Sequence, residues 1–192
     1  MGRIISQAAA KHLTPLTLEL GGKSPVIVDP GHPDLDIVAR RIMFGKCCTA
    51  GQLCVSPDYV LFPSNDKKEK EALLNAFKKA CSAFFPKEEG EEALKSKSLS
   101  KMINLNHFKR VTAMISATKG TVITGGKWDE KTLRIEPTIV LFDKEGWEDD
   151  ALMLGENFGP VLPIVVDDFG GQGLKGATKS VRARWVSSSY SF

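Results

Sequence analysis

Long apolar runs are missing from this sequence. No stretch approaches the roughly 18 consecutive apolar residues that a membrane-spanning helix needs. Residues 1–10 also lack the apolar core of a secretory signal peptide. We therefore expect no membrane segment in this chain and a cytoplasmic location.

Cysteine is scarce as well, with four residues at Cys47, Cys48, Cys54 and Cys81. So few, unevenly spaced cysteines do not make a disulfide framework in a chain of 192 residues, and a reducing compartment keeps them as thiols. A zinc site is disfavoured too, because adjacent cysteines suit tetrahedral zinc poorly and no fourth Cys or His stands at a usable spacing. We expect no metal, and a chemical role is left open for one thiol.

A strong charge of either sign is also absent. The chain has 26 Lys and Arg residues against 23 Asp and Glu residues, and acids are interleaved with bases, as where Glu71 follows Lys67–Lys70. Without a basic stripe, we expect no nucleic-acid partner. A composition of 42% hydrophobic and 26% charged residues is typical of one globular domain that buries a core.

Apolar residues recur with strand-like and helix-like spacings in turn. Leu16–Leu20 alternates apolar and polar residues, which predicts a strand that points Glu19 away from its leucine face and ends at Gly21-Gly22. Further strands are expected at 25–28, 59–62, 121–124, 133–141 and 161–166.

Helices are expected between these strands. Asp34 predicts an N-cap for a helix that runs to about Gly45, and Asp66 with Glu69 forms a capping-box pattern before another helix. Two more helices are expected at 4–12 and around 108–115. Strands that alternate with helices indicate an α/β fold.

From Gly170 onward the sequence has no clear periodicity, which favours a poorly ordered tail. Gly171–Gly176 matches the G-x-G-x-x-G pattern of dinucleotide-binding loops. However, only the 16 residues from 177 to 192 follow it, too few for a βαβ unit, and none of them is acidic. A flexible linker is the better interpretation.

Two residues stand out as candidates for chemistry. Cys54 lies in a loop of small residues between a helix and a strand, where a thiol can be presented to a ligand. Glu19 stands between leucines directly before two glycines, an unusual place for a carboxylate unless it faces a cavity and acts as a base. A small apolar filler for Cys54 and an outward-facing strand residue for Glu19 are the alternatives that this pattern leaves open.

Several motifs resemble the aldehyde dehydrogenase superfamily in residue type, order and spacing. They are Leu18–Pro25, Gly51–Cys54, Pro57–Val60, Glu136–Thr138 and Phe158–Pro163. Ala8–Pro15 and Ile103–Arg110 are similar to the class 3 and fatty aldehyde dehydrogenase branch in particular. The resemblance covers roughly residues 2–166, about the middle third of a full-length member.

The resemblance implies NAD- or NADP-dependent oxidation of aliphatic or aromatic aldehydes to acids, and a homodimer. It makes Cys54 the nucleophile that forms a thiohemiacetal, which becomes a thioester after hydride transfer to the nicotinamide. It makes Glu19 the base that activates water against that thioester, and it implies an oxyanion-hole role for the Cys54 N–H. Glu156 and Phe158 match the pair that contacts the nicotinamide ribose and ring.

The resemblance also predicts the domain organisation. Residues 1–22 are expected to be a remnant of the Rossmann-type cofactor domain, residues 23–166 the incomplete catalytic domain, and residues 167–192 a tail unlike the family. The chain departs from the family at Leu53, where Thr is usual, and in Gly155-Glu156-Asn157-Phe158, where Glu-Glu-Ile-Phe is common.

The glycine-rich cofactor loop and the oxyanion-hole Asn of the family lie upstream of the part that this chain matches. We therefore expect weak cofactor binding and little activity from the chain alone. The alternative is a catalytically inactive fragment that at most binds a full-length partner.

Overall fold

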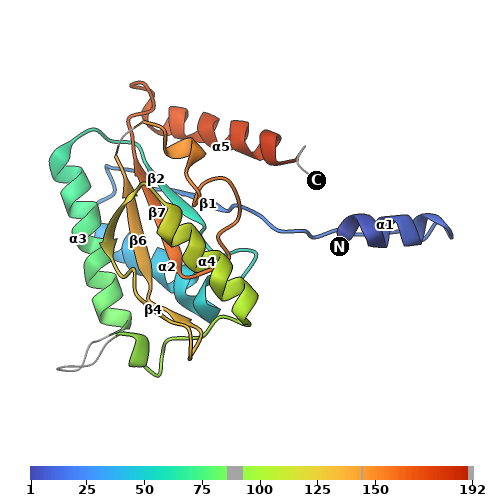
Figure 1. The fold of residues 1–192 in the computed structure, drawn as a ribbon. Helices are drawn as coiled ribbons and strands as arrows, with labels where there is room; N and C mark the ends of the chain where they lie inside the picture. Colours follow the sequence, from blue (N-terminus) through green and yellow to red (C-terminus); the bar gives the residue numbers. More distant parts are fainter. Residues whose placement is uncertain (86–92, 144, 190–192) are drawn as a thin grey trace.

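The computed structural model describes residues 1–85, 93–143 and 145–189 (Figure 1). The α-helices are α1 (Gly2–Ala10), α2 (Leu35–Cys47), α3 (Lys67–Phe84), α4 (Leu105–Ala117) and α5 (Gly173–Ser189). Short 3-10 turns are η1 (Cys48–Gly51), η2 (Ala93–Lys95) and η3 (Trp147–Asp149). The strands are β1 (Pro25–Ile27), β2 (Tyr59–Phe62), β3 (Thr121–Thr124), β4 (Trp128–Asp129), β5 (Arg134–Ile135), β6 (Thr138–Phe142) and β7 (Val161–Val166).

A mixed sheet with the strand order β1-β2-β7-β6-β3 forms the centre of the molecule. The first four strands are parallel, with Val60 opposite Ile164 and Thr138 opposite Val161, and β3 pairs antiparallel to β6. β4 and β5 form a separate two-stranded sheet. The fold is therefore α/β, as the alternating periodicity predicted.

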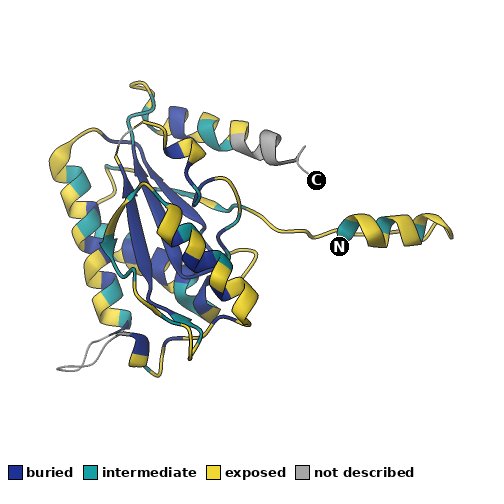
Figure 2. Cartoon of the chain, in the orientation of Figure 1, coloured by how far each residue is buried: buried dark blue, intermediate teal, exposed yellow. Residues whose placement is uncertain are grey.

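Helices cover both faces of this sheet (Figures 1 and 2). On β2, Val60 and Phe62 join a core with α2 and α3, whereas Tyr59 and Leu61 join a core with α4 and Ala177 of α5. Because both faces are buried, the central strands read as continuous apolar runs without a polar side.

The predicted helix caps at Asp34 and Asp66 are confirmed. Asp34 accepts a hydrogen bond from the Ile37 N–H at 2.9 Å. Asp66 accepts from the N–H groups of Lys68 and Glu69, while the Glu69 carboxylate accepts from the Ser64 hydroxyl. These caps fix the start of α2, which leads into the cysteine-rich loop, and of α3 behind it.

The structure differs from the sequence-based expectations at both ends of the chain. Leu16–Leu20 forms no strand, because it pairs with no strand of the sheet in the described part of the chain. The segment is extended and exposed. α1 projects from the body beside this segment (Figure 1). The expected poorly ordered tail instead contains helix α5, which buries Ala177 against the core; residues 190–192 lie outside the described part.

No helix within the described residues is both long and apolar enough to span a lipid bilayer.

Candidate functional site

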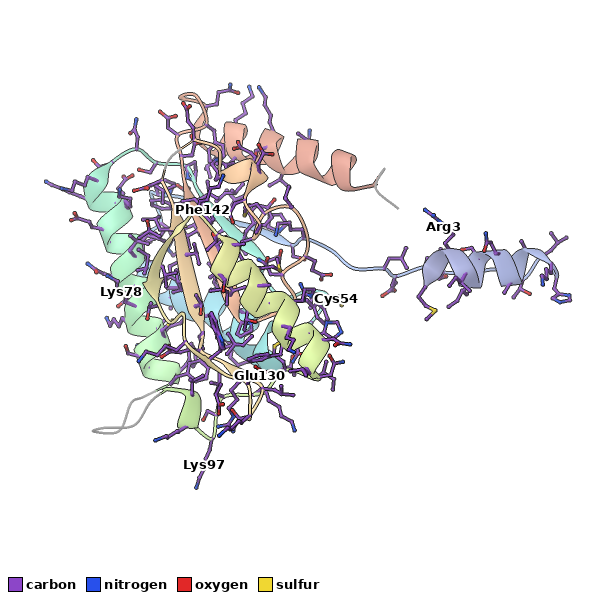
Figure 3. The ribbon with its side chains drawn as sticks, viewed as in Figure 1. Arg3, Cys54, Lys78, Lys97, Glu130 and Phe142 are labelled. Carbon is purple, nitrogen blue, oxygen red and sulfur yellow. The ribbon has the colours of Figure 1, made fainter. Side chains whose placement is uncertain are left out.

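Cys54 lies on an exposed turn between η1 and β2 (Figure 3). The chain reaches it through three successive left-handed residues, Thr49, Ala50 and Gly51, with φ of 50°, 55° and 72°. A side chain at Gly51 is excluded, since its Cβ would lie 2.3 Å from the carbonyl oxygen of Gly159. This backbone is unfavourable for Thr and Ala and is held only by its surroundings. It presents Cys54 at the surface and brings its loop against the segment that contains Gly159.

The Gln52 side chain stabilises the loop through three hydrogen bonds. Its Nε2 donates to the carbonyls of Thr49 at 2.8 Å and Lys101 at 3.2 Å, and its Oε1 accepts from the Ile103 N–H at 2.9 Å. A surface hollow of about 480 Å³ lies beside Gln52 and Thr49, and Cys54 is not among its lining residues. Gln52 therefore links the turn that carries Cys54 to the segment before α4.

Two of the other three cysteines are poorly suited to act as nucleophiles. Burial raises the pKa of Cys47 to about 12, and the nearby Cys81 adds to the rise. Burial likewise raises the pKa of Cys81 to about 12, with a further contribution from Glu136. Since the thiolate is the reactive form, both thiols are expected to be inert near neutral pH.

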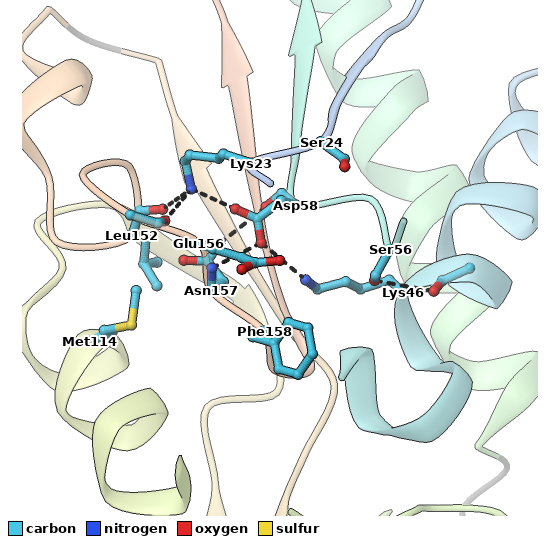
Figure 4. Close-up of polar contacts among 12 residues, drawn as sticks. Lys23, Ser24, Lys46, Ser56, Asp58, Met114, Leu152, Glu156, Asn157 and Phe158 are labelled. Atoms are coloured by element: carbon cyan, nitrogen blue, oxygen red, sulfur yellow. Dashed lines mark hydrogen bonds and ion pairs between the residues drawn. The ribbon is translucent and has the colours of Figure 1, made fainter. Parts of the chain in front are cut away.

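Asp58, at the start of β2, is the centre of a buried polar cluster (Figure 4). Its Oδ2 lies 2.6 Å from Lys23 Nζ, and its Oδ1 lies 3.7 Å from Lys46 Nζ. Its own N–H donates to the Ser24 carbonyl at 2.8 Å, and the Ser24 hydroxyl donates to the Cys54 carbonyl at 3.4 Å. Asp58 thus ties the segment of Lys23 and Ser24, which borders Cys54, to the sheet.

Lys46 is the member of this cluster whose charge is least compensated. Its side chain is 1% exposed, and Nζ makes no hydrogen bond to any described residue. Burial lowers the pKa of Lys46 from 10.5 to about 8, although the Asp58 carboxylate opposes the shift. A charged Lys46 is therefore maintained at neutral pH only at a cost in stability.

Glu156 and Phe158 lie together on the segment between η3 and β7. Arg110 of α4 donates to the carbonyls of Glu156, Asn157 and Phe158 at 3.2, 2.7 and 3.5 Å. Phe158 has a left-handed φ of 44°, and both Phe158 and Glu156 are half-buried. Burial raises the pKa of Glu156, whereas a hydrogen bond from the Gly22 N–H opposes the rise.

The segment that contains Glu19 reaches the same region. At Gly21, with φ of 132°, a Cβ would lie 2.6 Å from the Glu156 carboxylate, and at Gly22 it would lie 4.0 Å from the Cys54 carbonyl. A side chain at Gly21 would therefore collide with the Glu156 carboxylate, whereas Gly22 lies in ordinary contact with the Cys54 carbonyl. The Glu19 side chain itself is exposed, and the expected strand around it does not form. That Glu19 and Cys54 share one cavity stays a prediction.

Four residues of the site had no role assigned from the sequence. Asp58 and Gln52 fall within the quoted motifs, but their contacts depend on distant segments. A signal for Lys46 was available, because it follows Ile42 by four residues on the apolar face of α2. Arg110 ends the Ile103–Arg110 motif, but its place on the helix gave no signal of a site contact, since an Arg on a helix is usually solvated.

No group of three or more His, Cys, Asp or Glu side chains among the described residues is arranged to hold a metal ion.

Comparison with known proteins identifies the family. Residues 1–170 match the sequence profile of the aldehyde dehydrogenase family. Aldehyde dehydrogenase family 3 member H1 of Arabidopsis thaliana is 42% identical over 168 residues, which are 86% of this chain and 32% of that protein. A rat aldehyde dehydrogenase described as dimeric and NADP-preferring is 44% identical over 165 residues, with 86% and 34% coverage.

Solved structures agree with the sequence comparison. The substrate-bound AldH of Staphylococcus aureus superposes with a TM-score of 0.74 at 36% identity, over 86% of this chain and 34% of that one. A gamma-glutamyl-gamma-aminobutyraldehyde dehydrogenase from Burkholderia cenocepacia gives 0.70 at 30% identity, over 87% and 33%. The chain spans about a third of the length of the relatives it matches. It belongs to the aldehyde dehydrogenase family, and its relatives include members of the class 3 branch.

Proposed function

We propose that this chain carries the nucleophile and part of the cofactor site for the oxidation of aldehydes to carboxylic acids. Cys54 is the nucleophile. Its sulfur bonds to the aldehyde carbonyl carbon and the thiol proton passes to the carbonyl oxygen, which gives a thiohemiacetal. A bound NAD or NADP would supply the hydride acceptor through which this adduct, on also losing its hydroxyl proton, becomes a thioester on Cys54. The observation that carries the proposal is the loop around Cys54, which is held in a left-handed conformation and packs directly against the segment of Glu156 and Phe158.

Glu19 is proposed as the base for the second half of the reaction. A thioester is a good acyl donor, but water near pH 7 needs a base to attack it. Glu19 lies three residues before Gly22, which contacts the Cys54 carbonyl. Its side chain is exposed, and its backbone is not part of a strand. Glu19 takes a proton from water as the water oxygen bonds to the acyl carbon, and the C–S bond breaks to release the carboxylic acid and the Cys54 thiolate.

The residues present fit the nicotinamide end of NAD or NADP. The Glu156 carboxylate is half-buried and bonded to the Gly22 N–H, so it offers fixed acceptor oxygens to ribose hydroxyls. The ring of Phe158 is placed by a backbone that Arg110 holds through three carbonyls. When bound, the cofactor supplies the hydride acceptor. Because one relative is described as NADP-preferring, the proposal includes NADP as well as NAD.

Formation of NADH or NADPH from an aliphatic aldehyde, followed at 340 nm, tests the proposal. The matched control is Cys54→Ser, which changes one exposed atom and should leave the fold intact. Turnover that the Cys54→Ser variant abolishes supports the proposal. Turnover that survives in this variant contradicts Cys54 as the nucleophile, whereas a wild-type chain without turnover favours the alternative of a fragment that only binds a partner.

A further inference from the structure

Asn157, between Glu156 and Phe158, is completely buried. It bonds twice to one partner. Its backbone N–H donates to Asp58 Oδ1 at 3.0 Å, and its side-chain Nδ2 donates to the Asp58 carbonyl at 3.1 Å (Figure 4). This pair of bonds holds the segment against Asp58, directly before β2.

Asp58, which accepts both of these bonds, is itself held in place by other residues. Lys23 holds the other carboxylate oxygen of Asp58 at 2.6 Å and also donates to the carbonyls of Leu152 and Gly155, both at 2.8 Å. The Asp58 N–H is bonded to Ser24. A rigid acceptor makes the position of Asn157 well defined, since neither bond can shift without disturbing the buried ion pair.

The residue after Asn157 needs such support. Phe158 has a φ of 44°, a left-handed conformation that a bulky residue adopts only when its surroundings enforce it. Arg110 donates to the carbonyls of this segment, and the Asn157 side chain bonds the segment to Asp58. Because Phe158 is the proposed ring contact, the direction of its side chain depends on both.

We propose that Asn157 is a positioning residue of this site: its two bonds to Asp58 hold Phe158 in the left-handed conformation that aims its ring. The inference deepens the proposed function, on which the role of Phe158 rests. The side-chain bond to the Asp58 carbonyl carries the specific effect, because the backbone bond is available to any residue except proline.

Hydrogen exchange followed by mass spectrometry on the full chain tests this directly. In Asn157→Ile, which replaces the side-chain amide by an apolar group, the segment 152–160 should exchange about tenfold faster, the effect of losing roughly one buried hydrogen bond. Asn157→Asp keeps the size, removes the Nδ2 donor and adds a carboxylate beside Asp58, so it should exchange at least as fast. Asn65→Ala, which removes a side-chain bond to Asp168 elsewhere in the molecule, is the matched control and should leave 152–160 unchanged.

A purely structural role gives a different pattern. If Asn157 only stabilised the fold, exchange in β7 would rise with that in 152–160, and urea unfolding would show an equal loss. Faster exchange confined to 152–160 supports the positioning role; unchanged exchange in Asn157→Ile, or a uniform rise across the chain, overturns it. Because exchange requires neither cofactor nor turnover, its result stands apart from the test of aldehyde oxidation.

Discussion

Replacement of Lys46 by Met should make the protein at least as stable at pH 7 and change how its stability depends on pH. Folding lowers the pKa of Lys46 from 10.5 to about 8, mainly through burial. A shift of this size corresponds to about 3 kcal/mol of destabilisation while the amine is charged. The Asp58 carboxylate keeps its shorter contact with Lys23, so removal of Lys46 does not leave it unpaired.

The sign of the pH effect follows from proton binding. Because the pKa is lower in the folded state, the unfolded chain binds more protons between pH 8 and 10.5, and the penalty is relieved as the pH rises through that window. From pH 7 to pH 9 the wild type should gain about 1 kcal/mol relative to Lys46→Met. Because the pKa values of Cys47 and Cys81 are raised to about 12, both proteins lose stability above pH 9, and Lys46 affects only the Cys47 part of this loss.

Urea unfolding of both proteins at pH 7, 8 and 9, with reductant present, measures this difference. The reasoning requires the free energy of unfolding of the wild type minus that of Lys46→Met to increase with pH. A difference that stays constant or falls would refute it, because a buried lysine with an ordinary pKa contributes no such slope.

Three other predictions follow from the site. Limiting iodoacetamide with mass-spectrometric mapping should label Cys54 before the half-buried Cys47 and Cys81, and faster labelling of either would contradict the assigned nucleophile. Gly51→Ala should lower the free energy of unfolding by at least about 1 kcal/mol in urea, because its φ of 72° is strained for Ala; an unchanged midpoint would mean that the loop is held less tightly. Arg110→Ala should lose about 2–3 kcal/mol in the same assay, with partial recovery in Arg110→Lys, and an equal loss in both would show that the Lys side chain cannot replace the guanidinium fork.

Much of the fold could be predicted because its signals are local. The caps at Asp34 and Asp66 depend on residues two or three positions away, and the central strands are continuous apolar runs because both faces are covered. Leu16–Leu20 shows the limit of such reasoning. Its alternation is that of a strand, but a strand also needs a neighbour to bond its backbone, and none of the described residues provides one there.

The site was predicted in part for the same reason. Cys54 could be placed on a loop from its small neighbours, and the structure confirms that it is exposed. The cluster around Asp58 could not be predicted, because its contacts join residues 35 and 99 positions apart. The conformation of Phe158 likewise depends on Arg110, 48 positions away, and no local pattern predicts it.

The central claim is that Cys54 is the nucleophile that accepts the acyl group. The most direct test is to treat the protein with an activated ester and find which residue becomes acylated. Attack of the Cys54 sulfur on p-nitrophenyl acetate releases p-nitrophenolate and leaves the same kind of thioester, without any need for a hydride acceptor. We predict a burst of p-nitrophenolate, an acetyl group on the peptide that contains Cys54, and longer-lived acetylation in Glu19→Gln. A burst of equal size in Cys54→Ser, or an acetyl group found only on other residues, would contradict the account.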